Sequence, residues 1–410
     1  MVLILAGLIP LTTHPLVAQT STLKGFVSDQ SNGQALEGAT IALFALETTR
    51  QPPLHGTATT AEGVYIINKI EPGNYRLRIS FIGFIAHEEM ISLSSGESKT
   101  LSVALLEDAE AMSEVVIESQ RAVGIPDLLV GKQEIRPEDI EAIPSPDISA
   151  DLATYLTVLP GVVTTGDRGG QFFVRGGEPP QNLVLLDDIV IYQPFHVLGF
   201  YSAFPADIIE KVDFYASGYG AKYAGRLSSV IDVQTRAGNL KRFGGHASLS
   251  PFTSTISLEG PIVPDKVSFL VSGRTSNVKQ SGEHIYKEDL PFDFDDGFAK
   301  IQFSPGQRHR FAVAGLRTYD RGRLVPDLEA EASQDIIWRN KGFSFSWLSI
   351  SRSLPLATKL TFSSSEHKME QGASDGAQRF SKIATSRVGL EAIFSDGSFF
   401  GGSAHTRAGW

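Results

Sequence analysis

Two groups of carboxylates are the residues of this chain whose types and spacing could do chemistry. Asp187 and Asp188 are adjacent, as in a metal-binding or acid–base pair. A second group lies further along and suggests a calcium loop: Asp289, Asp293, Asp295 and Asp296. An EF-hand is excluded because Gly297 falls one place early and the closing glutamate is absent. We therefore expect a hairpin turn at Asp187-Asp188 and an acidic loop between strands at the second group.

Other motifs that could support catalysis are incomplete. His87-Glu88-Glu89 follows an expected strand without forming an HExxH or HxxEH zinc motif, so a solvated strand edge is expected there. Gly218-Tyr219-Gly220 lacks the third glycine of a dinucleotide-binding loop. His196 has apolar neighbours, which is typical of a packed histidine. Because the chain has no cysteine, thiol nucleophiles and zinc–cysteine sites are excluded too. The sequence predicts no enzyme, no metal centre and no cofactor.

Length and composition indicate the scaffold that must position any site. The chain has 410 residues, enough for at least two domains. Its net charge of −10, from 36 Lys and Arg against 46 Asp and Glu, argues against nucleic-acid binding. Gly (39) and Phe (25) are abundant, which favours a β-rich chain with many tight turns.

The N-terminus has the form of an export signal. The apolar run Val2–Ile9 is followed by Pro10 and by small residues suited to cleavage, so residues 1–19 are predicted to be a signal peptide. No Lys or Arg follows Met1, which is atypical, and a buried N-terminal strand is the alternative. No later stretch is apolar over the ~18 residues that a membrane helix needs, so any membrane crossing must use β-strands.

Residues 22–107 contain short apolar runs separated by turn sequences such as Ser31-Asn32-Gly33. This pattern predicts a β-sandwich. The segment resembles the carboxypeptidase regulatory-like domain through five stretches: Lys24–Val27, Leu36–Ile41, Thr59–Gly63, Glu71–Tyr75 and Ile82–Phe84. Despite its name, that domain is a non-catalytic sandwich, and we expect a periplasmic interaction module.

Residues 108–120 begin acidic and lose the strand pattern. Within them lies a β-prone stretch that a partner could take up as an added strand: Ser113, Glu114, Val115, Val116, Ile117, Glu118 and Ser119. Its position resembles that of the TonB box, the segment through which TonB-dependent receptors bind TonB. An ordinary edge strand is the alternative.

Residues 121–238 resemble the plug domain of TonB-dependent outer-membrane receptors through six linked motifs: Ile135–Ile140, Leu159–Val162, Phe172–Gly177, Gln181–Asp188, Ile208–Tyr215 and Tyr223–Val233. A helix over residues 150–156, capped by Asp147 or Ser149, is expected near the start. The resemblance implies a small mixed α/β globule inside a barrel, where buried arginines need carboxylate partners. Candidate plug–barrel contacts are two arginines and their neighbouring glycines: Arg175, Gly176, Gly177, Gly225 and Arg226. The alternative is that both arginines are ordinary surface residues.

In residues 239–410, apolar and polar side chains alternate with a period of two, as in Phe343-Ser344-Phe345-Ser346-Trp347. An apolar outer face and a polar inner face are typical of a transmembrane β-barrel. We count about eight expected strands of ~10 residues, whereas the family's barrel has about twenty-two and eight would leave no room for a plug. We therefore expect the N-terminal part of an incomplete barrel. Trp410 resembles the C-terminal aromatic residue of outer-membrane proteins, and we treat this likeness as a coincidence.

The predicted fold class is mainly β: an N-terminal β-sandwich, a small mixed α/β plug and the first part of an antiparallel transmembrane barrel. The resemblance implies a receptor in the cell outer membrane that imports a small-molecule substrate, such as a siderophore, another metal chelate, a vitamin or an oligosaccharide, without catalysis. Its expected partners are TonB and outer-membrane lipid, and a lipoprotein lid is not expected. The alternatives are a non-transporting binding or signalling protein and, disfavoured by the lack of a zinc motif, a carboxypeptidase.

Overall fold

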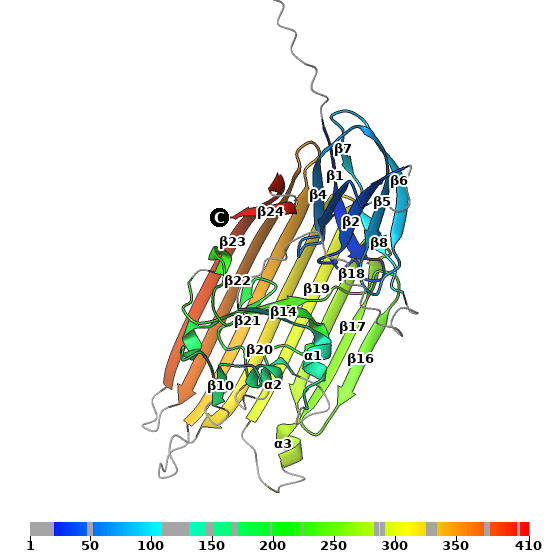
Figure 1. Cartoon of the computed structure of the whole chain (residues 1–410). Coiled ribbons are helices and arrows are strands. Elements are labelled where there is room, and N and C mark those ends of the chain that lie inside the picture. The colour runs from blue at the N-terminus through cyan, green and yellow to red at the C-terminus, as the bar shows by residue number, and fades with distance from the viewer. Residues whose placement is uncertain are drawn as a thin grey trace, which may run out of the picture.

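The computed structural model describes residues 20–46, 52–108, 131–144, 151–165, 171–196, 199, 201–223, 225–282, 287, 292–324, 334–372, 378–399 and 402–409. The predicted signal peptide, the 113–119 stretch, and Asp147 and Ser149 lie outside them. The described chain consists of a sandwich, a mixed α/β plug and a long antiparallel sheet, which confirms the predicted fold class (Figure 1). No helix among the described residues is long and apolar enough to cross a membrane.

The sandwich is built from two small sheets. One has the order β4-β1-β7, with β8 also pairing with β1, and the other has the order β3-β2-β5-β6. Its strands are β1 (Ser21–Asp29), β2 (Thr40–Ala45), β3 (His55–Ala58), β4 (Val64–Ile70), β5 (Gly73–Ser80), β6 (His87–Leu93), β7 (Ser98–Thr100) and β8 (Val103–Leu105). Inward-pointing side chains such as Leu23, Ile41, Leu77 and Ile79 form an apolar core between the sheets and are fully buried.

The plug has a five-stranded sheet of order β13-β12-β15-β14-β9 and a separate β10-β11 hairpin. Its elements are β9 (Lys132–Ile135), α1 (Pro137–Glu141), α2 (Leu152–Thr157), β10 (Val162–Thr165), β11 (Gln171–Val174), β12 (Leu183–Leu186), β13 (Ile189–Val190), β14 (Ile209–Tyr215) and β15 (Val230–Thr235), with short 3₁₀ turns at Pro179–Gln181, Ala206–Ile208 and Ala221–Tyr223. The prediction that Asp147 or Ser149 caps helix α2 is wrong. Its N-cap is Asp151, whose side chain accepts a hydrogen bond from the Ala153 amide, and the helix begins at Leu152 rather than at residue 150.

The third part is a nine-stranded antiparallel sheet in chain order, here called the wall, against about eight strands expected. It comprises β16 (Gly244–Leu249), β17 (Thr253–Val263), β18 (Val267–Ser276), β19 (Phe292–Gly306), β20 (His309–Leu324), β21 (Gln334–Ile350), β22 (Leu356–Gly372), β23 (Gln378–Phe399) and β24 (Gly402–Gly409), with the short helix α3 (Val278–Ser281) after β18. The plug elements lie across one face of the long strands, and the sandwich lies at one end (Figure 1). We call the face toward the plug the inner face.

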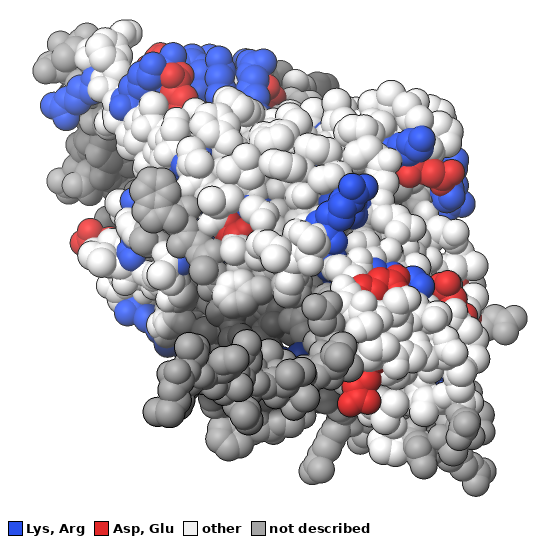
Figure 2. All heavy atoms as spheres, turned by 90° about the horizontal axis from the view of Figure 1, so that it is seen from above, with Lys and Arg blue, Asp and Glu red and all other residues white. Residues whose placement is uncertain are grey.

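The period-two pattern of the wall separates its two faces as predicted. Outward positions include exposed Phe343, Val388 and Leu390. Seen from above, at the end where the sandwich lies, the molecule carries its Lys, Arg, Asp and Glu side chains in a few groups on a largely uncharged surface (Figure 2). The inner face contributes Leu270, Phe298, Ala314 and Leu316 to the apolar core of the plug. Plug and wall therefore share one continuous core.

The predicted acidic loop is wrong for its described residues. Asp293, Asp295 and Asp296 belong to strand β19, and Asp289 lies outside the described residues. Aspartate is depleted in strands, but Asp296 lies on the inner face of β19, where Arg274 and His196 are its charged partners. A strand with a carboxylate on that face is therefore stable.

Candidate functional site

The most heavily charged contact between the plug and the wall is a cluster centred on Arg274 of β18. Arg274 is buried, with 5% of its side chain exposed. The guanidinium donates from Nε and Nη2 to Asp296 Oδ2, at 3.0 and 2.7 Å, and from Nη1 to Asp151 Oδ2 of the plug, at 3.0 Å. It also donates to the carbonyl of Ser202. One wall arginine thus binds the plug through both a carboxylate and the backbone.

Asp151 links this contact to the local structure of the plug. Its Oδ1 accepts hydrogen bonds from the amides of Ala153 and Ser202, both at 2.8 Å, so the same oxygen caps α2 and holds a second loop. Its Oδ2 accepts from Arg274. The two oxygens therefore have separate tasks: Oδ1 organises the plug and Oδ2 attaches it to the wall.

His196 is the second cation of the cluster. Its Nε2 lies 3.0 Å from Asp296 Oδ2 and its Nδ1 lies 2.9 Å from Asp320, and both aspartates are on the wall. The ring is fully buried and stacks on Phe294 with 3.9 Å between centroids. Burial opposes the charged imidazolium, but the two carboxylates outweigh it and raise the pKa of His196 to about 9. The histidine is packed, as predicted, and it is also a charged contact between plug and wall.

A second contact forms at the Asp187-Asp188 pair. These residues make the tight turn between β12 and β13, as predicted, and both have left-handed backbones, with φ of 45° and 68°. Lys300 of the wall lies 3.1 Å from Asp187 and donates to the Thr235 carbonyl at 2.7 Å. The carboxylate pair is therefore a structural hairpin bound to a wall lysine. Among the described residues, no group of three or more His, Asp or Glu is placed to hold a metal.

The predicted arginines contact plug atoms. Arg175 is exposed and donates to Ser217 at 2.8 Å, and the guanidinium of Arg226 lies 5.4 Å from the ring centroid of Tyr192. Within the described residues neither forms a salt bridge to the wall, so the pairing of these arginines with barrel carboxylates stays a prediction. The ionic contacts between plug and wall run in both directions: Arg274 of the wall pairs with Asp151 of the plug, and His196 of the plug pairs with Asp296 and Asp320 of the wall.

The glycines of the two motifs bring plug loops together. A Cβ at Gly177 would lie 2.3 Å from Ser228 Oγ, so only glycine fits where the two loops meet. Gly176 and Gly225 have left-handed backbones, with φ of 79° and 99°. The motifs that carry the family resemblance thus connect the plug internally.

The comparisons with known proteins agree with this architecture. Residues 22–106 match the model of the carboxypeptidase regulatory-like domain, and residues 129–229 match that of the TonB-dependent receptor plug domain. No curated protein matches the chain.

Solved structures share its fold. The siderophore receptor PirA from Acinetobacter baumannii matches 68% of this chain over 47% of its own length, at 14% identity and a TM-score of 0.51. The alcaligin outer-membrane receptor FauA from Bordetella pertussis matches 68% over 46%, at 12% identity and a TM-score of 0.51. FpvA of P. aeruginosa, solved with bound pyoverdines, matches 68% over 41%, at 10% identity and a TM-score of 0.50. The chain spans about half the length of these receptors.

A plug against the inner face of an antiparallel wall is the fold that the chain shares with these solved outer-membrane receptors. Residues 129–229 form a TonB-dependent receptor plug domain, and this match together with the shared fold confirms the resemblance predicted from the sequence. The plug match also agrees with the prediction of a non-enzymatic protein.

Proposed function

We propose that the protein imports a small molecule across the outer membrane by energy-coupled displacement of its plug. The observation that supports this most is the Arg274 cluster, which attaches the plug to the inner face of the wall. A plug attached in this way blocks the lumen until the contacts separate. No covalent step is required.

We further propose that TonB binds the stretch Ser113–Ser119. This stretch lies between β8 of the sandwich and β9 of the plug, within the linker that joins them. In the described part of the chain, strand β9 is the edge of the plug sheet and pairs with β14 alone, through four residue pairs from Val212↔Ile135 to Tyr215↔Lys132. A pull on the linker therefore acts first on an edge strand, which separates one pair at a time.

The substrate class is proposed from the relatives. PirA is a siderophore receptor, FauA is an alcaligin receptor and FpvA was solved with pyoverdines. Ferric siderophores are thus the first class to test, before other metal chelates, vitamins and oligosaccharides.

Uptake by whole cells tests the function. The full-length protein is expressed in cells that lack their own siderophore receptors, and accumulation of ⁵⁵Fe from a panel of ferric siderophores is measured. We expect uptake that requires TonB and is lost when residues 113–119 are deleted. Deletion of residues 120–126 shortens the linker equally and controls for length. Siderophore that binds to the cells but is not accumulated, with or without TonB, would favour a non-transporting binding protein instead.

A further inference from the structure

Strands β1 and β4 of the sandwich are buried on both faces, although a sandwich needs only one buried face. Tyr65 and Ile67 of β4 point into the sandwich core, whereas Val64 and Ile66 point away from it. On β1, the neighbours across the ladder are Phe26, opposite Val64, and Lys24, opposite Ile66. These four residues, here called the docking face, are at most 1% exposed. Something outside the sandwich therefore covers them.

The wall covers the docking face. Three apolar side chains lie side by side across β21, β22 and β23, in the register Ile350↔Ala357↔Ile393, and they form one buried cluster with Leu348 and the apolar docking residues. Nearer the plug, two of these strands, β21 and β22, carry mainly polar side chains on the inner face: Asn340, Ser344, Ser363, Ser365 and His367. An apolar patch on a polar wall, opposite an apolar patch on the sandwich, is a complementary interface.

Polar contacts surround this apolar centre. Lys24 Nζ donates to the Leu354 carbonyl at 2.6 Å, and Ser102 Oγ donates to the Gln307 carbonyl at 2.8 Å. Lys359 of β22 lies 3.5 Å from Glu62, just before β4. The Arg310 guanidinium stacks on Phe26, 4.3 Å from the ring centroid.

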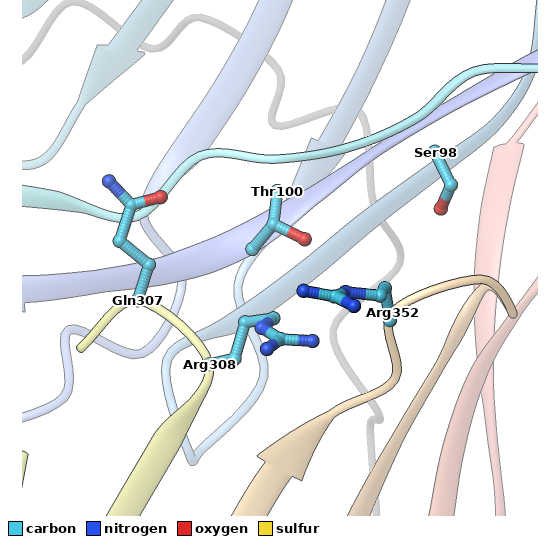
Figure 3. Close-up of a pocket in the computed structure, with 5 residues that line it drawn as sticks. All are labelled: Ser98, Thr100, Gln307, Arg308 and Arg352. Carbon is cyan, nitrogen blue, oxygen red and sulfur yellow. The ribbon is translucent and has the colours of Figure 1, made fainter. Parts of the chain in front are cut away.

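At one edge of this interface the contact opens to solvent. A pocket of about 250 Å³ lies there, between Ser98 and Thr100 of the sandwich and three residues of the wall turns: Gln307, Arg308 and Arg352 (Figure 3). The sealed part of the interface is therefore its apolar centre and not this edge.

We propose that the sandwich is a second closure of the lumen, in series with the plug, and that its docking face must leave the wall for transport. This inference rests on the proposed function. The sandwich and the plug are joined by the linker that contains Ser113–Ser119, so one pull acts on both bodies. The closure nearer the sandwich is mainly apolar, whereas the one at the plug includes a buried ionic cluster.

Site-specific crosslinking tests the proposal, because the chain has no cysteine of its own. Ser102→Cys with Gln307→Cys joins the sandwich to the wall through a short, reducible bis-thiosulfonate reagent. Arg78→Cys with Glu88→Cys, which face each other on β5 and β6, is the control that crosslinks within the sandwich. We expect both pairs to crosslink in intact cells. Only the first should reduce ⁵⁵Fe-siderophore uptake to the level of cells lacking TonB, with recovery after reduction.

Each other outcome contradicts part of the proposal. If the control pair crosslinks and the test pair does not, docking of the sandwich on the wall is refuted. If the test pair crosslinks and the protein still transports, the second closure is refuted. Protein that never transports, even without reagent, would refute the proposed function and the gating with it, while the crosslinking yield still decides docking. Ile66→Lys should abolish crosslinking of the test pair, whereas Ile82→Lys, at a position 94% exposed, should not.

Discussion

Substitution of Asp151 by Asn separates the two tasks of this side chain. The amide oxygen of Asn can still accept from Ala153 and Ser202, and Asn is as good an N-cap as Asp. The amide nitrogen, however, replaces the oxygen that faces Arg274. Both partners are buried, with side-chain exposures of 1% and 5%. Arg274 keeps its two hydrogen bonds to Asp296, so its charge stays compensated. The loss is that of one hydrogen bond between charged groups, about 1.5–3 kcal/mol, and we expect Asp151→Asn to weaken the attachment of the plug to the wall by that amount.

A double-mutant cycle isolates the contact. Asp151→Asn, Arg274→Gln and the double variant should show a coupling energy of roughly 1.5–3 kcal/mol, the value of a hydrogen bond between charged groups. Asp151→Ala should cost about 1 kcal/mol more than Asp151→Asn because the cap is also lost. The readout is hydrogen exchange of the α2 amides, which reports the free energy of local opening.

The control for this cycle is Arg175→Gln. Arg175 lies on the plug, is exposed and is bound only to plug atoms among the described residues, so its removal should change the protection of the α2 amides by less than about 0.5 kcal/mol. A coupling energy below about 0.5 kcal/mol between Asp151 and Arg274 would refute the view that this pair attaches the plug to the wall.

Three further predictions follow from individual side chains. The pKa of His196 is raised from 6.5 to about 9, so the charged ring stabilises the folded protein fully below pH 6.5, and this stabilisation is lost as the pH rises through 9. Thermal unfolding should therefore show that the protein loses about 3 kcal/mol of stability over this range, and His196→Gln should not show this loss. Asp188→Val forces a β-branched residue into a left-handed turn and should lower the unfolding midpoint by the equivalent of about 1–2 kcal/mol, while Asp188→Gly should not. Phe26→Ala removes a ring buried against the wall and should cost about 3–5 kcal/mol in chemical unfolding, whereas an unchanged midpoint would mean that this ring does not pack there.

The sequence predicted the fold class because its signals are local. The alternation of Phe343 to Trp347 defines the two faces of a strand without reference to any partner. The turn at Asp187-Asp188 was likewise predictable, since aspartate tolerates a left-handed backbone.

The plug–wall contacts could not be predicted in the same way. Arg274 and Asp296 occupy inner positions by alternation, but their partners Asp151 and His196 lie on other elements. The plug motifs draw attention to Arg175 and Arg226 and carry no signal for an arginine of the wall. Asp296 is predicted to lie in a loop between strands, and its place on β19 depends on partners that the sequence pattern does not bring beside it, Arg274 and His196.

A signal for the docking of the sandwich is present in the sequence. Val64-Tyr65-Ile66-Ile67 is a continuous apolar run, which is typical of a strand buried on both faces. In a free sandwich such a strand would expose Val64 and Ile66. The run therefore indicates a covered outer face, and only the structure shows that the wall covers it.

The chemistry of the two closures bears on how a blocked lumen can open without unfolding the protein. A buried ion cluster is seldom the most stable choice, because apolar groups of similar volume often stabilise an interface as well or better. The advantage of an ion cluster appears when the plug and the wall separate. Once water enters, Asp151, Arg274 and His196 regain hydration, which offsets much of the lost attraction, whereas an apolar surface of similar area would remain costly to expose. The sandwich interface, with its apolar centre, lacks this compensation. In the proposed mechanism, therefore, the work done through the linker falls more heavily on the sandwich than on the charged contacts of the plug.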